Sequence, residues 1–143
     1  MPDYDIIPAP CFTGCGLNEK HMELPLFKAV LVFDKDRCDG VPAMARLLQA
    51  LCGIEDYIRL ACAFDAASGR VHVALACAGK LLLCNSYEAP DCVTALYYMV
   101  AVPARFGFKP SIVNVHMAGD VPGELGSYLS RYFKGVKSIS CES

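Results

Sequence analysis

One stretch of the sequence, residues 71–87, constrains the fold more than any other. Residues 71–77 alternate in part between apolar and other side chains, and residues 81–87 form a second strand-like run. Between the two runs stand Ala78, Gly79 and Lys80, which make a short turn that contains glycine. Two such runs joined by a short glycine turn are typical of a β-hairpin. The chain is therefore expected to contain a sheet.

The segments around this hairpin alternate between helical and strand patterns. A helix is predicted after Pro90 and Asp91, with Pro103 kinking or ending it. Residues 57–64 are apolar and fit either a strand or a helix, and residues 13–23 are polar and expected to form a loop. The other predicted elements are strands at residues 28–33, 111–116 and 136–140 and helices at residues 41–51 and 125–132. This order predicts an α/β fold, a mixed sheet with flanking helices.

Length and composition limit the domain organisation and the class of protein. A chain of 143 residues is the size of one domain, which we divide into an extended segment and loop (residues 1–25) and an α/β core (residues 26–143). Hydrophobic residues make up 55% of the chain, which excludes intrinsic disorder. A net charge of −2 gives no basic field for nucleic acid, and the apolar runs are too short to span a membrane. The first residues lack the features of a signal peptide, so we expect a cytoplasmic protein.

Nine cysteines are unusual for a chain of this length. The odd count and the lack of a secretion signal argue against a disulfide framework. Most of the cysteines lie in apolar runs, where a reduced cysteine packs as a small hydrophobic side chain. Cys11 and Cys15, with His21 as a third ligand, offer a zinc or thiol site as a minor alternative to core packing.

A predicted strand ends in Asn85, Ser86 and an aromatic residue, and the helix that follows contains Tyr97 and Tyr98. With these features the chain resembles an uncharacterised bacterial family, domain of unknown function family 3822. The resemblance continues at residues 111–117, 125–133 and 136–139, with further similarity at residues 6–12 and 27–33. The fold of this family is similar to the actin-like ATPase, or ribonuclease-H-like, architecture. The resemblance implies a two-lobed protein about twice this length, of which this chain lacks the opening hairpin of the first lobe.

Active actin-like ATPases hold phosphate and metal at acidic and glycine-rich turns at the tips of hairpins, so the resemblance raises nucleotide binding as an alternative function. The turn at Gly79 and Lys80 has no Asp, Ser or Thr, and the loop with Gly119 and Asp120 loosely matches the turn that accepts adenosine. A simple turn from strand to helix explains the loop with Gly119 and Asp120 at least as well. Neither a Gly-x4-Gly-Lys-Ser/Thr loop nor a Gly-x-Gly-x-x-Gly motif is present.

A ribonuclease-H-like nuclease would need clustered carboxylates to hold two metal ions. Asp34 and Asp36 follow one strand and Asp120 follows another, but a solvated turn explains the first two. His72 and His116 both fall in predicted strands, where a hydrogen-bonded structural histidine is the usual case. We therefore predict no catalytic residue and no cofactor.

Aromatic residues on the two later helices are candidates for a partner surface. Tyrosine is enriched at interface hot spots, although packing of helix on sheet is the first explanation for Tyr97, Tyr98, Tyr128 and Tyr132. An open sheet edge would also favour self-association, so we expect a homo-oligomer or a protein partner. The leading hypothesis is a non-enzymatic binding or scaffolding module with an actin-like fold. The alternatives are a degenerate nucleotide-binding protein and, as a minor one, the zinc or thiol site.

Overall fold

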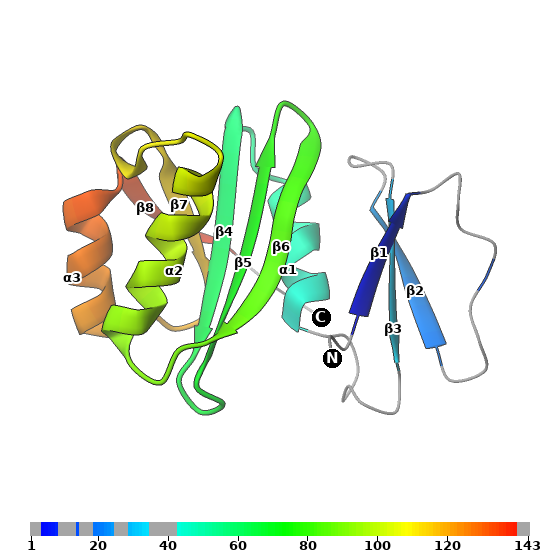
Figure 1. Cartoon of the computed structure of the whole chain (residues 1–143), viewed down its shortest axis with the longest axis horizontal. Coiled ribbons are helices and arrows are strands. Elements are labelled where there is room, and N and C mark those ends of the chain that lie inside the picture. The colour runs from blue at the N-terminus through cyan, green and yellow to red at the C-terminus, as the bar shows by residue number, and fades with distance from the viewer. Residues whose placement is uncertain (1–3, 9–13, 15–18, 25–28, 35–42, 140–143) are drawn as a thin grey trace.

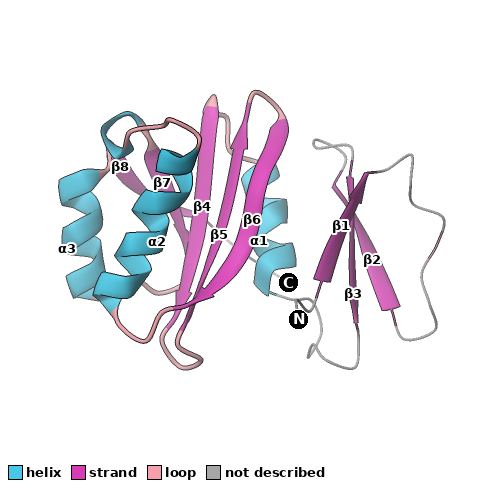
Figure 2. Ribbon diagram, in the orientation of Figure 1, coloured by secondary structure: helices cyan, strands magenta, loops and turns pink. Residues whose placement is uncertain are grey.

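The structure is a computed structural model that describes residues 4–8, 14, 19–24, 29–34 and 43–139. Its main body is a five-stranded sheet with the strand order β6-β5-β4-β7-β8 (Figures 1 and 2). β4 pairs antiparallel with β5 and β5 with β6, whereas β4, β7 and β8 run parallel. The strands are β4 (Ile58–Asp65), β5 (Arg70–Cys77), β6 (Lys80–Glu88), β7 (Asn114–Ala118) and β8 (Gly135–Ile139).

Helices cover both faces of this sheet, and each face has its own buried core (Figure 2). On one face lies α1 (Ala43–Cys52), which buries Leu47, Leu48 and Leu51 against alanines of β4 and β5. The small alanine side chains allow the helix to approach the sheet closely. On the other face lie α2 (Cys92–Arg105) and α3 (Gly123–Tyr132), packed against larger residues such as Leu60, Val73 and Val115. A short 3-10 helix, η3 (Pro110–Ile112), leads into β7.

A second, smaller sheet precedes α1 in the chain. Its three strands are β1 (Tyr4–Pro8), β2 (Glu19–Leu24) and β3 (Ala29–Asp34), in the order β1-β3-β2 with antiparallel neighbours. α1 contacts β2, so this helix lies between the two sheets (Figure 1). Residues 19–24 form β2, so the loop predicted at residues 13–23 is wrong for residues 19–23. The polar residues Glu19, Lys20 and Glu23 of β2 are interspersed with apolar ones, which is compatible with a strand.

The predicted fold class, a mixed sheet with flanking helices, is confirmed. The ambiguous residues 57–64 belong to β4, the central strand of the larger sheet. Pro103 lies inside α2, which ends two residues later at Arg105. The strand expected at residues 111–116 begins later, at Asn114, because η3 occupies the residues before it. No helix in the described part of the chain is long and apolar enough to cross a bilayer.

Candidate binding pocket

The carboxyl ends of the parallel strands β4 and β7 meet at one edge of the five-stranded sheet. Ala63 of β4 is opposite Ala118 of β7, so Asp65 and Gly119 follow at the same edge. From β4 the chain turns to β5 on one side, whereas β7 lies on the other side. Such a point, where the chain leaves neighbouring strands in opposite directions, is where open α/β sheets usually bind ligands.

A pocket with a volume of about 510 Å³ lies at this edge. Most of its wall is apolar and comes from β4, from Ala118 and from the segment that follows β7. Its polar lining residues are Asp65, His72 and Asp120, and no lysine or arginine is among the lining residues. The pocket therefore combines an apolar wall with two carboxylates.

The turn from β4 to β5 is closed by its own aspartate. Asp65 Oδ1 accepts the backbone N–H groups of Ala67 at 3.1 Å and Ser68 at 3.4 Å. Hydrogen bonds from Ser68 and then from the Ala67 amide lower the pKa of the Asp65 carboxyl below its usual range. Gly69, at φ +66°, completes the turn, and its carbonyl accepts the N–H of Ala89. The backbone N–H groups of Ala67 and Ser68 are thus already hydrogen-bonded to the Asp65 carboxylate.

His72 stands on β5 beside the same pocket. Its Nδ1 is 2.6 Å from Ser86 Oγ on β6, a hydrogen bond that fixes the ring. Burial lowers the pKa of His72 below its usual value of 6.5, while nearby Asp65 raises it and Arg70 lowers it. The ring is therefore neutral at neutral pH and adds no positive charge to the pocket.

The loop after β7 forms the opposite wall. Gly119 has φ +75°, a left-handed conformation that favours glycine, and a Cβ built there meets no atom within 4 Å. Asp120 follows and is exposed, and α3 begins soon afterwards at Gly123. Gly119 and Asp120, two of the four residues proposed for nucleotide binding, therefore both line the pocket.

Gly79 and Lys80, the other two residues of that set, lie at the opposite end of the sheet. The turn before Lys80 is anchored by a hydrogen bond from the Ala78 N–H to the Tyr57 carbonyl, at the start of β4. The pocket is at the other end of β4, which spans about 23 Å at ~3.3 Å per residue. The four residues cannot form one site. Only the topology shows this, since both glycine turns give the same signal in the sequence.

The predicted β5–β6 hairpin is confirmed, and a further hairpin, β4–β5, precedes it in the chain. Its turn does contain an aspartate and a serine, Asp65 and Ser68. The sequence alone does not reveal this hairpin turn, because residues 57–64, which precede it, fit either a strand or a helix.

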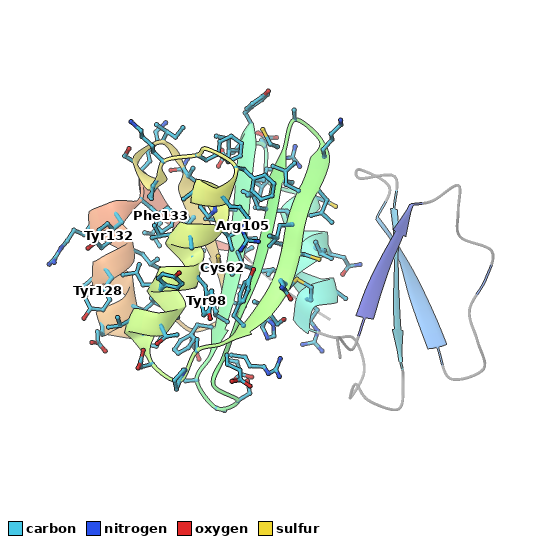
Figure 3. All side chains as sticks on the ribbon, in the orientation of Figure 1. Cys62, Tyr98, Arg105, Tyr128, Tyr132 and Phe133 are labelled. Atoms are coloured by element: carbon cyan, nitrogen blue, oxygen red, sulfur yellow. The ribbon has the colours of Figure 1, made fainter. Side chains whose placement is uncertain are left out.

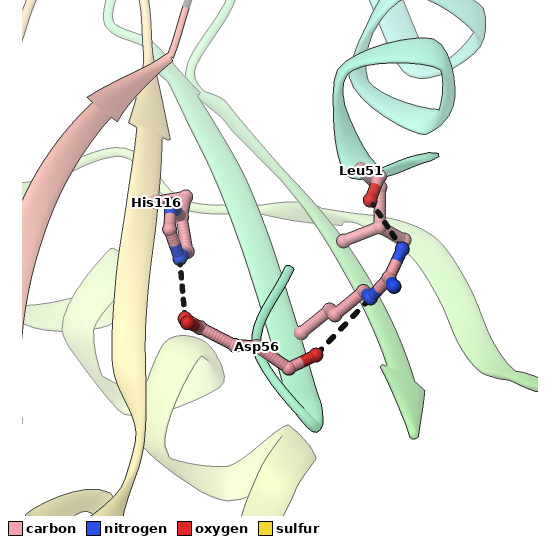
Figure 4. Close-up of polar contacts among 4 residues, drawn as sticks. Leu51, Asp56 and His116 are labelled. Carbon is pink, nitrogen blue, oxygen red and sulfur yellow. Dashed lines mark hydrogen bonds and ion pairs between the residues drawn. The ribbon is translucent and has the colours of Figure 1, made fainter. Parts of the chain in front are cut away.

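At the end of the sheet where β4 begins, hydrogen bonds of polar side chains connect α1, β4 and β7 (Figure 4). His116 of β7 is 7% exposed, and its Nε2 is 2.9 Å from Asp56 Oδ2. The pKa of Asp56 is lowered, chiefly by this hydrogen bond. Arg59 donates to the carbonyl of Asp56 at 3.1 Å and to those of Leu51 and Cys52, at the end of α1, at 3.3 Å each. These contacts hold the α1–β4 connection against the sheet.

The four candidate tyrosines differ in their surroundings, and Figure 3 labels three of them, Tyr98, Tyr128 and Tyr132. Tyr98 stacks on Tyr87 of β6 with ring centroids 4.3 Å apart, so it packs between α2 and the sheet. Tyr128 is half-buried and donates to Glu124 Oε1 at 3.1 Å. Tyr97 is 65% exposed and Tyr132 49% exposed. Of the four, these two are the most exposed, and only Tyr97 has more than half of its surface exposed.

The metal candidates fall largely outside the described residues. Cys11, Cys15 and Asp36 lie there, while His21 belongs to β2 and is opposite Val32. Asp34 ends β3, and Asp120 lines the pocket. Within the described ranges, no group of three His, Cys, Asp or Glu side chains could hold a metal ion.

The cysteines of the larger sheet pack among apolar residues. Cys62 is fully buried in the core under α2 and α3, and burial raises the pKa of its thiol. Burial also raises the pKa of Cys52 and Cys92. These thiols are protonated at neutral pH, as expected of cysteines that act as small hydrophobic side chains.

Comparisons with known proteins agree with this architecture. The family model described as "Protein of unknown function (DUF3822)" matches residues 27–136. A crystal structure from Bacteroides thetaiotaomicron, described as a protein with actin-like ATPase fold and unknown function, is similar with a TM-score of 0.64 at 15% identity. That match covers 95% of this chain and 64% of the other. Among curated proteins, none matches. The resemblance in family and fold is confirmed.

Proposed function

Because the chain belongs to the DUF3822 family of proteins of unknown function and has an actin-like ATPase fold, we propose that it is a binding or scaffolding module that does not hydrolyse nucleotides. The observation that carries this proposal is the Asp65 carboxylate in the β4–β5 turn. Backbone amides at such a turn can hold the oxygens of a phosphate. Here Asp65 supplies those oxygens from within the chain.

The charge of the pocket supports the same conclusion. A phosphate that entered the turn would have to displace the Asp65 carboxylate from the amides of Ala67 and Ser68. It would also meet the carboxylate of Asp120 and a neutral His72, with no lysine or arginine in the pocket lining. The negative charges of a polyphosphate and of the two carboxylates would repel each other. The pocket therefore disfavours a bare polyphosphate.

The outer face of α2 supports a role in binding a protein. Tyr97 and Val93, one helical turn apart, are 65% and 58% exposed. Together with Tyr132 of α3, they form the partner surface of this proposal. Tyr98 supports the ring of Tyr97 edge-on and stacks on Tyr87, whereas Tyr128 donates a hydrogen bond to Glu124 of its own helix. We expect this module to act in the cytoplasm of a bacterium, where cysteines stay reduced.

Calorimetric titration with Mg-ATP tests the proposal. The expected result is no binding tighter than about 1 mM, because the turn is filled and the pocket is acidic. Tight, stoichiometric binding would overturn it. Asp65→Asn is the matched variant, because it keeps an oxygen that can accept from the two amides but removes the negative charge. It therefore distinguishes two reasons for weak ATP binding: occupied amides and charge repulsion.

A degenerate nucleotide-binding protein remains the second candidate. The pocket itself favours it, because Gly119 and Asp120 line a cavity at the carboxyl ends of β4 and β7. If Mg-ATP binds at all, Gly119→Ala should weaken binding, and Gly79→Ala at the far end of the sheet should not. An affinity that is unchanged in Gly119→Ala would remove this candidate.

The zinc or thiol site at Cys11 and Cys15 stays a minor proposal, since both cysteines lie outside the described residues. Its test is metal analysis of protein purified without chelator, and the absence of zinc would end it.

A further inference from the structure

The outer face of α2 is apolar and carries no charge, although much of it is exposed. Residues 92–104 contain no charged side chain, and the helix ends at Arg105. Val93 is 58% exposed and Tyr97 65% exposed, and Ala104 is exposed as well. The outer face of a helix on the surface of a domain normally carries charged and polar residues. The outer face of α2 therefore has the composition of an interface.

The exposed residues of α2 form one stripe along the helix. At ~3.6 residues per turn, Val93, Tyr97, Val100 and Ala104 lie within about 60° of one another around the helix axis. The residues on the opposite side of α2 are buried. Tyr97 projects from the stripe as a large ring, whereas Ala104 and the half-buried Ala101 are small. The stripe therefore offers both a side chain that can insert and shallow positions that can receive it.

The two ends of the stripe carry opposite charges. Asp91 caps the start of α2, where its Oδ1 accepts the N–H of Thr94 at 2.7 Å. Arg105 lies in the last turn (Figure 3) and forms no ion pair with another described residue. Each charge suits the dipole of its own helix end, but the dipole does not explain the absence of charge between them. Both side chains are exposed and can therefore also meet the charges of a partner.

Asp91 and Arg105 also lie on the same side of the stripe. At ~1.5 Å and ~100° per residue, they are about 21 Å apart along the helix but only about 40° apart around it. Tyr98 lies within about 20° of each around the axis, and it stacks on Tyr87 of β6. Both charges therefore flank the stripe on the side of β6, and a partner helix must present its own charges on that side.

A second copy of α2 meets this requirement. In an antiparallel pair with a two-fold axis between residues 98 and 99, residue 93 of one copy is level with residue 104 of the other, and residue 97 with residue 100. This axis lies in the plane of the interface, perpendicular to the helices, so the β6 side of one stripe lies over the β6 side of the other. Arg105 of each copy then lies beside Asp91 of the other. Tyr97 packs against Val100 and Ala101 of the second copy.

We propose that two copies of this chain associate through the outer faces of their α2 helices in this register. This pairing rests on the proposed function, because it makes a second copy the partner of the surface formed by Val93, Tyr97 and Tyr132. No residue of α2 lines the pocket. The oligomeric state and the titration with Mg-ATP can therefore fail separately, and a monomeric protein would contradict only the choice of partner.

Tyr97→Glu tests the interface. The oligomeric state of the full chain is measured by analytical ultracentrifugation from low to high micromolar concentration. Wild type should form a dimer, and Tyr97→Glu should remain monomeric, because its carboxylate would be buried without a partner near the two-fold axis. Tyr57→Glu, which changes a 72% exposed tyrosine just before β4, is the matched control and should leave the dimer intact. Circular dichroism should show the same helix content in wild type and both variants, which confirms that they are folded.

Arg105→Glu and Asp91→Asn test the register. Arg105→Glu should raise the dissociation constant of the dimer about tenfold, because a carboxylate then lies beside Asp91 at both ends. Asp91→Asn keeps a side chain that can cap the helix but removes the charge. The double variant should therefore dimerise more tightly than Arg105→Glu alone. Such a recovery cannot arise within one chain, because about 21 Å of helix separates the two residues and salt screens charges over that distance.

Three results would overturn the proposal. The first is a wild type that stays monomeric over the whole concentration range. The second is a dimer that Tyr97→Glu weakens no more than Tyr57→Glu does. The third is a double variant that dimerises no more tightly than Arg105→Glu alone.

Discussion

At the start of β4, hydrogen bonds from a few side chains join three elements, whereas at the carboxyl end of the same strand the turn is closed by its own residues. Arg59 and the His116–Asp56 pair join α1, β4 and β7 at the first end. At the second end, Asp65 bonds residues two and three positions further along, and a pocket remains beside it. Hydrogen bonds at the first end therefore join separate elements, whereas those of Asp65 at the second end stay within one turn, beside the pocket.

The largest effect is expected from Arg59→Met. This substitution keeps an aliphatic stem but removes the bonds to the carbonyls of Asp56, Leu51 and Cys52. The free energy of unfolding should fall by about 2 kcal/mol, because part-buried carbonyls lose a charged donor. Urea denaturation measures it.

The control for this prediction is Arg70→Met at the pocket end. Arg70 is exposed, so its replacement should change the unfolding free energy by less than about 0.5 kcal/mol. If Arg59→Met and Arg70→Met lower the free energy of unfolding by the same amount, the proposed difference between the two ends of β4 is wrong.

The His116–Asp56 pair should give the next largest effect, and a dependence on pH. The pKa of Asp56 is lowered in the fold, so its contribution is present above the unfolded value, near 3.8, and is lost as pH falls through the folded value. Asp56→Ala should cost about 1 kcal/mol at neutral pH and less in acid. Chemical denaturation at neutral and acidic pH measures both. A loss that is equal at the two pH values would contradict the assignment to the carboxylate.

Gly79→Ala and Gly119→Ala introduce similar backbone strain at opposite ends of the five-stranded sheet, so they allow the two ends to be compared. The glycines have φ +80° and +75°, and a Cβ meets no atom within 4 Å at either position. Each substitution should therefore cost about 1 kcal/mol through conformation alone. Thermal unfolding should show similar shifts for both, and only Gly119→Ala should alter the binding of any pocket ligand. A far larger loss for one glycine would reveal a contact that conformation does not explain.

The smallest effect is expected from Asp65→Asn. The asparagine carbonyl can still accept the N–H groups of Ala67 and Ser68, since Asn closes the same kind of turn. Stability at neutral pH should change by a few tenths of a kcal/mol, about the limit for an exposed site. Asp65→Ala, which leaves those amides without an acceptor from residue 65, should cost more. If the two variants lose the same stability, the hydrogen bonds of Asp65 are not what holds the turn.

Much of the larger sheet could be predicted because its elements carry strong local patterns. The β5–β6 hairpin and the two later helices have clear periodicity and turn residues. β4 was ambiguous because the central strand is covered on both faces: Cys62 lies in the core under α2 and α3, and Ala61 in the core under α1. Such a strand shows no alternation of apolar and polar residues.

The pocket was harder to predict because it depends on topology. Gly79 and Gly119 both follow strands in the sequence, and only the strand order places them at opposite ends of the sheet. The His116–Asp56 contact joins residues 60 positions apart, a separation over which sequence spacing carries no information. The Asp65 turn did have a local signal, an aspartate three residues before Ser68, but it is recognisable only once β4 is known to be a strand.

The most direct test of the central claim is a nuclear magnetic resonance measurement on the amide protons of Ala67 and Ser68. If the Asp65 carboxylate fills the turn, both amide shifts should change as acid protonates Asp65, at a pH below its usual pKa. At neutral pH they should stay constant when Mg-ATP is added. Amides that respond to Mg-ATP and not to the protonation of Asp65 would show that the turn is open to phosphate, and would contradict the account.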